Sequence, residues 1–122
     1  MEKSILVVDD STYIYEELEY MLSDTSFQLI GHAKSGEDAV DLYENLKPDL
    51  VTMDIVLPGM DGLETANIII HNHADAKIIM LSSLAYDDTI EEAKRIGACG
   101  FIFKPIEKNA LISALEKCFE TN

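Results

Sequence analysis

Five short apolar runs, separated by stretches with helical spacing, constrain the fold of this chain more than any other feature. The runs cover residues 4–8, 27–32, 49–53, 77–81 and 100–103. Two of them, "SILVV" and "KIIML", have the apolar character of strands that are buried on both faces of a sheet. Between the runs, apolar residues recur every three or four positions, which predicts amphipathic helices. The chain therefore alternates strand and helix five times.

Five consecutive strand–helix units imply a parallel sheet with helices on both faces, because each crossover must be right-handed. The predicted boundaries agree with local signals: Ser35 caps a helix, Pro48 stops one, and Gly97 suits the left-handed position that ends another. The predicted fold class is α/β, with five helices. A flavodoxin-like, doubly wound sheet of order 2-1-3-4-5 fits five strands better than the six-stranded dinucleotide fold. Periodicity alone does not prove that order.

Length and cysteine usage indicate one ordinary domain over residues 1–122, large enough to bury a core without disulfides or a structural metal. Cys99 and Cys118 lie in apolar segments without metal-ligand spacing, so we expect buried, reduced thiols and no disulfide. The apolar run near the N-terminus is too short for a signal peptide or a membrane span. A cytoplasmic protein is expected.

The charge balance excludes several classes of partner. Nine basic and 23 acidic side chains give a formal charge of -14. This charge repels phosphate backbones and anionic membranes, so direct binding to nucleic acid or membrane is not expected. It would also repel a small phosphorylated ligand unless a bound cation cancelled the local charge.

Polar residues lie just beyond the carboxyl ends of the predicted strands. In doubly wound sheets, ligands bind at these ends. Asp9 and Asp10 end the first strand, and Asp54 ends the third. Strands one and three are neighbours in the proposed order, so three carboxylates should converge, with Ser82 and Lys104 supplied from strands four and five. Like charges this close disfavour full ionisation, and Mg²⁺ resolves the conflict. Asp54 could then act as a nucleophile toward phosphorus.

These residues resemble the receiver domain of two-component response regulators, and in particular its chemotaxis members. The resemblance rests on "VVDD" after the first strand, "MDIVLPGMDG" around Asp54, "MLSS" at the fourth strand and "FIFKP" at the fifth. The motifs span essentially the whole chain in the right order and spacing. The resemblance implies a phosphorylation-dependent signalling switch in which Asp54 accepts a phosphoryl group from a histidine kinase or a small acyl phosphate.

The same resemblance assigns the other site residues. Mg²⁺ would be held by Asp10 directly, by Asp9 mainly through water, by Asp54 and by the backbone carbonyl of Val56. Ser82 would supply the switch hydroxyl, and Phe101 would be the aromatic switch residue. Lys104 would bind the phosphoryl group, and its peptide bond to Pro105 would be cis.

The expected output is a change in the surface formed by the fourth helix, fifth strand and fifth helix. Plausible partner contacts there are Leu84, Tyr86, Phe103 and Ile106. The implied partners are a histidine kinase or phosphotransfer protein and a downstream effector. The chain would catalyse its own phosphorylation and dephosphorylation, but no turnover enzyme is expected.

Two positions depart from the better-known chemotaxis members. Val56 and Leu84 lie two residues past Asp54 and Ser82, where many relatives carry polar side chains that guide water. We hypothesise that apolar groups there disfavour an attacking water and prolong the phosphorylated state.

Simpler interpretations stand beside these. Adjacent aspartates often cap a helix, Ser82 could close a strand, and Phe101 could be core packing.

Other functions fit the sequence less well. A haloacid-dehalogenase-like phosphatase would need a D-x-D pattern after the first strand, and an unphosphorylated binding module would have little reason to keep all of the acids, the hydroxyl and the lysine. A flavodoxin would need small residues in place of the two acids. The three histidines, His32, His71 and His73, have no credible metal partner.

Overall fold

The fold is described from a computed structural model that covers residues 2–83 and 86–120. The strands are β1 (Lys3–Val8), β2 (Phe27–Ala33), β3 (Leu50–Asp54), β4 (Ile78–Ser82) and β5 (Gly100–Phe103). The helices are α1 (Thr12–Met21), α2 (Gly36–Leu46), α3 (Gly62–Asn72), α4 (Asp87–Ile96) and α5 (Lys108–Cys118). Each predicted element is present, and the strand boundaries differ from prediction by one residue at most.

The sheet has the order β2-β1-β3-β4-β5, and all four neighbouring pairs are parallel. This confirms the predicted doubly wound topology. The order reverses between β1 and β3, which are direct neighbours in the sheet. The carboxyl ends of these two strands are therefore adjacent, as a site at the switch point requires.

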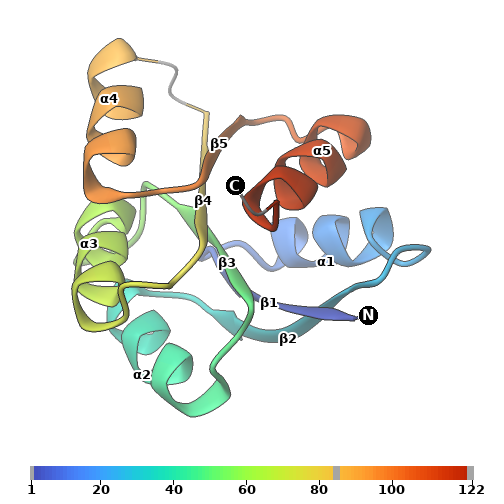
Figure 1. Ribbon diagram of the computed structural model, residues 1–122, viewed down its shortest axis with the longest axis horizontal. Coiled ribbons are helices and arrows are strands. Elements are labelled where there is room, and N and C mark those ends of the chain that lie inside the picture. Colours follow the sequence, from blue (N-terminus) through green and yellow to red (C-terminus); the bar gives the residue numbers. More distant parts are fainter. Residues whose placement is uncertain (1, 84–85, 121–122) are drawn as a thin grey trace.

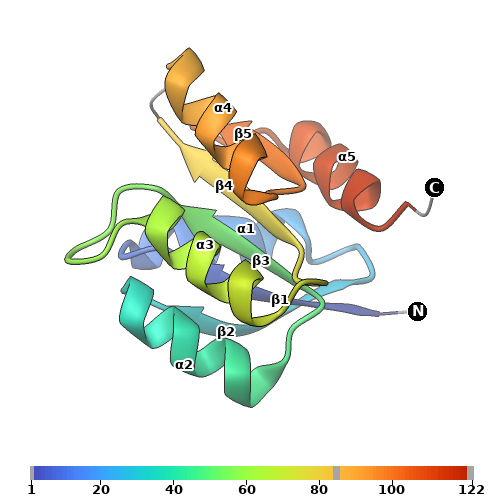
Figure 2. The same cartoon turned by 60° about the vertical axis from the view of Figure 1, so that its left-hand side comes forward.

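Helices cover both faces of the sheet, with α1 and α5 on one face and α2, α3 and α4 on the other (Figure 1). On the second face α3 lies between α2 and α4, and it contacts both (Figure 2). Alternate residues of β1 face opposite layers: Leu6 and Val8 join the core under α2 to α4, whereas Ile5 and Val7 join the core under α1 and α5. The period of two along each strand thus divides the apolar residues between two cores.

Two helix ends follow the predicted signals, at Ser35 and Gly97, and Asp61 forms a cap that was not predicted. The Ser35 side chain accepts a hydrogen bond from the Asp38 backbone N–H at 3.1 Å, and Asp61 does the same for Glu64 at 2.9 Å. Gly97 ends α4 with φ of 100°, in the left-handed region that favours glycine. These caps satisfy backbone donors and carbonyls that would otherwise be unpaired.

The prediction for the two cysteines is wrong. Cys99 and Cys118 form a disulfide, with 5.5 Å between their Cα atoms. Cys118 is buried as predicted, but Cys99 is exposed. The bond forms because α5 packs back against β5 and brings its last residue beside the residue that precedes β5. A separation of 19 residues gives no sign of this contact in the sequence.

Within residues 2–83 and 86–120, no helix has both the length and the apolar character that crossing a membrane requires.

Candidate functional site

Three carboxylates converge at the carboxyl end of the sheet. Asp9 and Asp10 directly follow β1, and Asp54 is the last residue of β3. One carboxylate oxygen of each lies within 4.8 Å of the others. The structure therefore brings together the three acidic residues that the strand ends indicated, from segments more than 40 residues apart.

Asp9 is buried and hydrogen-bonded in this cluster. It is 1% exposed, and its Oδ1 accepts a hydrogen bond from the Ser11 backbone N–H at 2.9 Å. The His32 ring contacts the Asp9 carbonyl oxygen at 2.8 Å and stacks on Tyr15, which gives this histidine a structural role. Asp10, in contrast, is exposed. The site thus combines one fixed buried carboxylate with one open to solvent.

Lys104 supplies the positive charge of the site. Its Nζ lies 3.1 Å from Asp9 Oδ2 and 3.4 Å from Asp54 Oδ2. The lysine directly follows β5, where its backbone N–H donates to the Ser82 carbonyl at 2.8 Å. The Lys104–Pro105 peptide bond is cis, as the sequence resemblance predicted. One ammonium therefore bridges the two buried carboxylates.

The electrostatic environment raises the pKa of Asp54. Burial is the largest cause, and the charge of Asp9 adds to it, whereas Lys104 and a hydrogen bond from the Val56 backbone N–H oppose the shift without cancelling it. The pKa of Lys104 is also raised: burial lowers it, but hydrogen bonds to Asp9 and Asp54 and their charges outweigh that effect. One ammonium thus leaves the carboxylates with uncompensated negative charge.

A divalent cation fits this donor set. Carboxylate and carbonyl oxygens are the ligands that Mg²⁺ prefers, and it usually retains several waters. Asp10 leaves an open side toward solvent for such waters. The side chain of Val56 is 62% exposed, so it does not fill the site.

The two remaining predicted residues lie at different depths. Ser82 is the last residue of β4, is 1% exposed, and pairs in register with Phe103 of β5. Phe101 is partly buried against the core under α2 to α4, and its ring centroid lies 5.3 Å from that of Phe103. Ser82 therefore shares the carboxyl edge with the acids, whereas Phe101 lies two residues further back along β5.

Sequence reasoning missed Gly62, the first residue of α3. Its backbone N–H donates to the Ile55 carbonyl at 2.7 Å, and a Cβ here would collide with the Asp54 backbone carbonyl oxygen. Only a residue without a side chain lets α3 begin so close to the strand end. The glycine that closes "PGMDG", directly before the next amphipathic segment, was the available signal.

The raised pKa of Asp54 leads to a stability prediction. The native state binds a proton at Asp54 more readily than the unfolded chain does, so ionisation of this group opposes folding at pH values above its native pKa. We expect Asp54→Asn to increase the free energy of unfolding at pH 7 without Mg²⁺ by about 1 kcal/mol, because the penalty on the ionised carboxylate is removed while Lys104 keeps its contact with Asp9. The gain should shrink as the pH falls through the native pKa, because the wild-type carboxyl is then protonated.

Urea denaturation in EDTA at several pH values measures this difference. Asp41→Asn, at an exposed position on α2, removes the same charge away from the site and should show no comparable gain. A variant at Asp54 that is less stable than the wild type at pH 7 would contradict the interpretation.

Comparisons with known proteins give one consistent result. Residues 5–116 match the family described as "Response regulator receiver domain". The chain is 36% identical over 113 residues to chemotaxis protein CheY of Listeria monocytogenes, covering 93% of this chain and 95% of that protein. It is 36% identical over 117 residues to CheY of Thermotoga maritima, covering 96% and 98%. A crystal structure of the CheX–CheY–BeF3–Mg²⁺ complex from Borrelia burgdorferi matches with a TM-score of 0.93 and 30% identity, covering 98% and 90%.

Proposed function

Since the chain belongs to the family of response regulator receiver domains, we propose that Asp54 is the residue that receives the phosphoryl group. Receiver domains of this family are phosphorylation-dependent switches of two-component signalling, not turnover enzymes. Asp54 is the last residue of β3, contacts Lys104 and lies beside two further acids. Asp9 also contacts Lys104, but Asp54 is favoured because one Asp9 oxygen is already held by the Ser11 backbone N–H. The convergence of the three acids is the observation that carries the proposal.

In the proposed step, a carboxylate oxygen of Asp54 forms a bond to phosphorus while the bond between phosphorus and the donor breaks. The donor is a phosphohistidine or a small acyl phosphate, and the imidazole or the carboxylate leaves with the bonding electrons. The Lys104 ammonium would leave the Asp54 carboxylate and contact the phosphoryl oxygens. These oxygens carry more negative charge than the carboxylate does. The raised pKa of Lys104 supports this role, because the side chain stays charged.

Mg²⁺ would be held by carboxylates of Asp9, Asp10 and Asp54 and by the carbonyl of Val56. When bound, it would neutralise negative charge on the transferring oxygens. The convergence of three acids supports this assignment, and the similar Borrelia burgdorferi complex contains both BeF3 and Mg²⁺. Asp9 is already engaged by Lys104 and Ser11, so it would act on the ion mainly through water.

Phosphorylation would be transmitted through Ser82 and Phe101 to the surface of α4, β5 and α5. On that surface Tyr86 is 64% exposed and Phe103 is 46% exposed, so both are available to a partner. Ile106 is 6% exposed, so the prediction that it contacts a partner does not fit this conformation. Leu84, a further predicted contact, lies outside the described residues.

The partners of CheY-like receiver domains are kinases and effectors. For this chain we propose a histidine kinase or phosphotransfer protein as donor and one downstream effector protein. The formal charge of -14 argues against direct nucleic-acid binding by these 122 residues. A cytoplasmic location and a single receiver domain over residues 1–122 stay predictions.

Incubation with acetyl phosphate, followed by intact-protein mass measurement, tests the proposal. We expect one added phosphoryl group that requires Mg²⁺ and is absent from Asp54→Asn. Lys104→Ala should still bind Mg²⁺ but show a weaker change in the α4–β5–α5 surface. Steady release of phosphate from small phosphate esters would instead favour a phosphatase, and labelling of Asp54→Asn would place the acceptor elsewhere.

The lifetime of the phosphorylated state is a separate prediction. Val56 presents an exposed apolar side chain two residues after Asp54, where it cannot orient a water molecule by hydrogen bonding. We expect the aspartyl phosphate to persist for minutes or longer without a phosphatase, and Val56→Asn to shorten its lifetime about tenfold. Decay of the wild-type phosphoprotein within seconds would contradict this prediction.

A further inference from the structure

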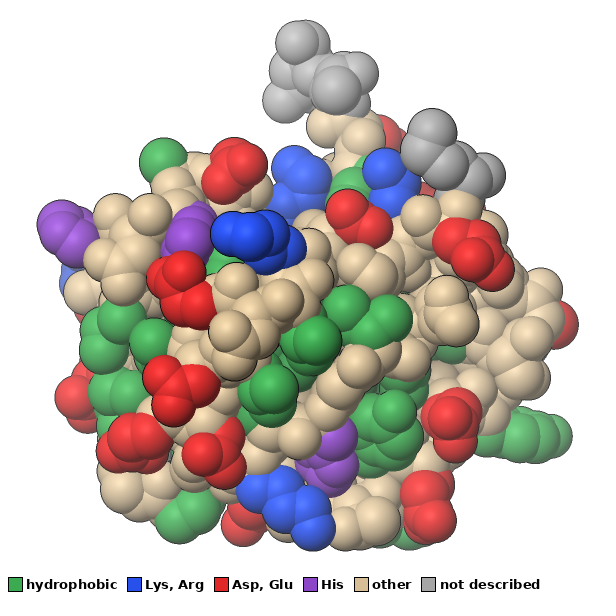
Figure 3. All heavy atoms as spheres, turned by 90° about the horizontal axis from the view of Figure 1, so that it is seen from below, with side chains coloured by type: hydrophobic (Ala, Val, Ile, Leu, Met, Phe, Trp, Pro, Cys, Tyr) green, Lys and Arg blue, Asp and Glu red, His purple; other side chains and the backbone are tan. Residues whose placement is uncertain are grey.

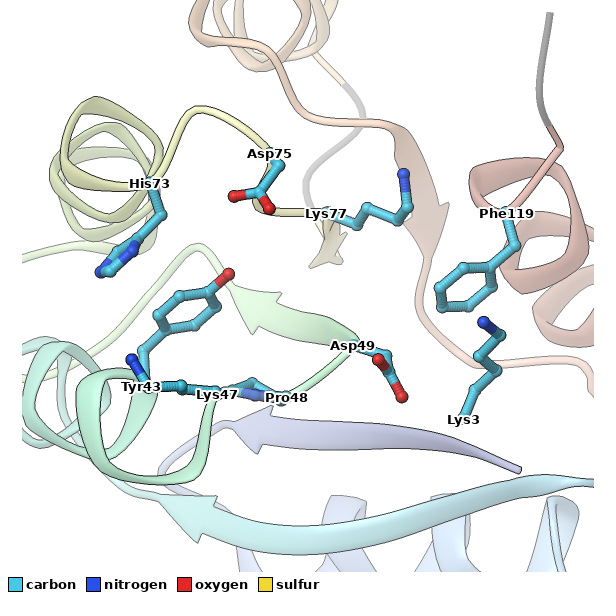
Figure 4. Close-up of a pocket in the computed structure, with 9 residues that line it drawn as sticks. All are labelled: Lys3, Tyr43, Lys47, Pro48, Asp49, His73, Asp75, Lys77 and Phe119. Atoms are coloured by element: carbon cyan, nitrogen blue, oxygen red, sulfur yellow. The ribbon is translucent and has the colours of Figure 1, made fainter. Parts of the chain in front are cut away.

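A pocket of about 550 Å³ opens at the end of the sheet opposite to Asp54. We call it the basic pocket, because Lys3, Lys47 and Lys77 line it (Figure 4). Lys3 begins β1, Lys47 caps the end of α2, and Lys77 immediately precedes β4. Three separate segments therefore each supply a lysine to the lining of one hollow, together with the Phe119 ring that follows α5.

The charge of the basic pocket is the reverse of that of the whole chain. Three of the nine Lys and Arg residues line it, but only two of the 23 Asp and Glu residues do. Acidic side chains are scattered over the face of the molecule that Figure 3 shows. Because three lysines lie close to one hollow of an acidic protein, the electrostatic potential there favours an anion.

Carboxylates do not neutralise these lysines. Among residues 2–83 and 86–120, no salt bridge within 4.0 Å involves any of the three. Instead, the Nζ atoms of Lys3 and Lys77 lie 5.0 Å and 5.9 Å from the centroid of the Phe119 ring. One aromatic ring thus contacts two ammonium groups, and a bound anion would supply the full negative charge that the ring lacks.

The two acidic residues of the basic pocket, Asp49 and Asp75, differ in their hydrogen bonds and in the direction of their carboxylates. Asp49 accepts hydrogen bonds from the Ser4 backbone N–H at 2.8 Å and from the Ser4 hydroxyl at 3.2 Å. Asp75 points its carboxylate toward the hollow in Figure 4, and its charge adds to burial in raising the pKa of Tyr43. His73 is paired with Glu44 at 2.8 Å. The negatively charged carboxylates of Asp49 and Asp75 would both oppose an anion, and Asp75 is the one that the Ser4 hydrogen bonds do not hold.

We propose that the basic pocket binds a small molecule that carries two or more linked phosphate groups. Lysine ammonium groups bind phosphate as point charges, without the fixed fork of arginine. Lys3 and Lys77 lie over Phe119, whereas Lys47 lies on the Tyr43 side of the pocket (Figure 4). An extended chain of phosphates would contact lysines on both sides, whereas a single phosphate would be expected to contact one side. The phosphate chain could belong to a nucleotide or to an inorganic polyphosphate.

The basic pocket is independent of the phosphorylation site. Asp49 directly precedes β3 and Asp54 ends it, and a rise of five positions along the strand places their Cα atoms about 17 Å apart. A ligand of the pocket therefore does not contact the carboxylates around Lys104. Binding can be measured whether or not Asp54 is the phosphoryl acceptor.

Titration of the wild-type protein with tripolyphosphate and, separately, with ATP tests the proposal. Both titrations are done at low salt in EDTA, so that no metal bridges the probe to the acidic site, and binding is followed by calorimetry and backbone amide NMR. We expect a dissociation constant below about 1 mM for at least one probe. Amide shifts should centre on Lys3, Lys77 and Phe119. Tighter binding of ATP would identify a nucleotide ligand, and equal binding would identify the phosphate chain as the recognised group.

Charge variants supply the decisive comparison. Lys77→Gln should weaken binding about fivefold, and Asp75→Asn should strengthen it by a similar factor. Lys94→Gln removes the same charge on exposed α4 and should leave binding unchanged. The proposal is overturned if neither probe shows saturable binding, or if Lys77→Gln and Lys94→Gln lose affinity equally. Amide shifts centred on Lys104 would also overturn it.

Discussion

Replacing Gly62 with alanine is expected to lower the free energy of unfolding by about 3 kcal/mol, the upper end for overpacking a buried site. The new Cβ would collide with the Asp54 carbonyl oxygen and lie 2.8 Å from the Ile55 Cα. Both neighbours are backbone atoms of a central strand end, so neither can turn aside as a side chain could. Relief requires α3 or the end of β3 to move.

The same substitution should slow phosphorylation, because movement at the end of β3 displaces the Asp54 carboxylate from Lys104 and from the other two acids. Urea denaturation measures the stability, and labelling by acetyl phosphate measures the site. Gly100→Ala is the matched control: its Cβ would meet the Ile79 side chain at 3.3 Å, and a side chain can adjust. Similar losses in both variants would show that close approach to backbone is not the cause.

Reduction of the Cys99–Cys118 disulfide is expected to lower the free energy of unfolding by about 3 kcal/mol. The bond closes a loop between residues 19 apart, and opening a loop of that length restores this much chain entropy to the unfolded state. The loop contains β5 and α5, so the cross-link acts on the segment that carries Lys104 and Phe103. The effect should appear as a lower urea midpoint in dithiothreitol.

Cys99→Ser separates the loss of the cross-link from other effects of the reductant. Cys99 is exposed, so serine at this position buries no additional polar group. The variant should match the reduced wild type, and dithiothreitol should not change its midpoint. A midpoint of the wild type that is insensitive to dithiothreitol, with the thiols shown to be free, would contradict the prediction.

Local sequence patterns predicted most of the fold. The boundaries of β5 agree with the predicted run, and Ser35 and Gly97 occupy the cap positions expected of them. These features depend on neighbours a few residues apart, which is the range that periodicity and capping report. The convergence of Asp9, Asp10 and Asp54 could also be predicted, because parallel strands place all their carboxyl ends at one edge.

The contacts that local patterns could not predict join residues that are distant along the chain. The Cys99–Cys118 bond depends on how α5 lies on β5, and the basic pocket depends on four segments meeting at the end of the sheet opposite to Asp54. The role of Gly62 depends on how closely α3 approaches β3. Apolar periodicity determines which side of an element is buried, but the distance and angle at which two elements pack depend on side chains from both. The sequence alone therefore determined the elements and the edge that holds the site, while tertiary packing decided the cross-link, the close approach and the second pocket.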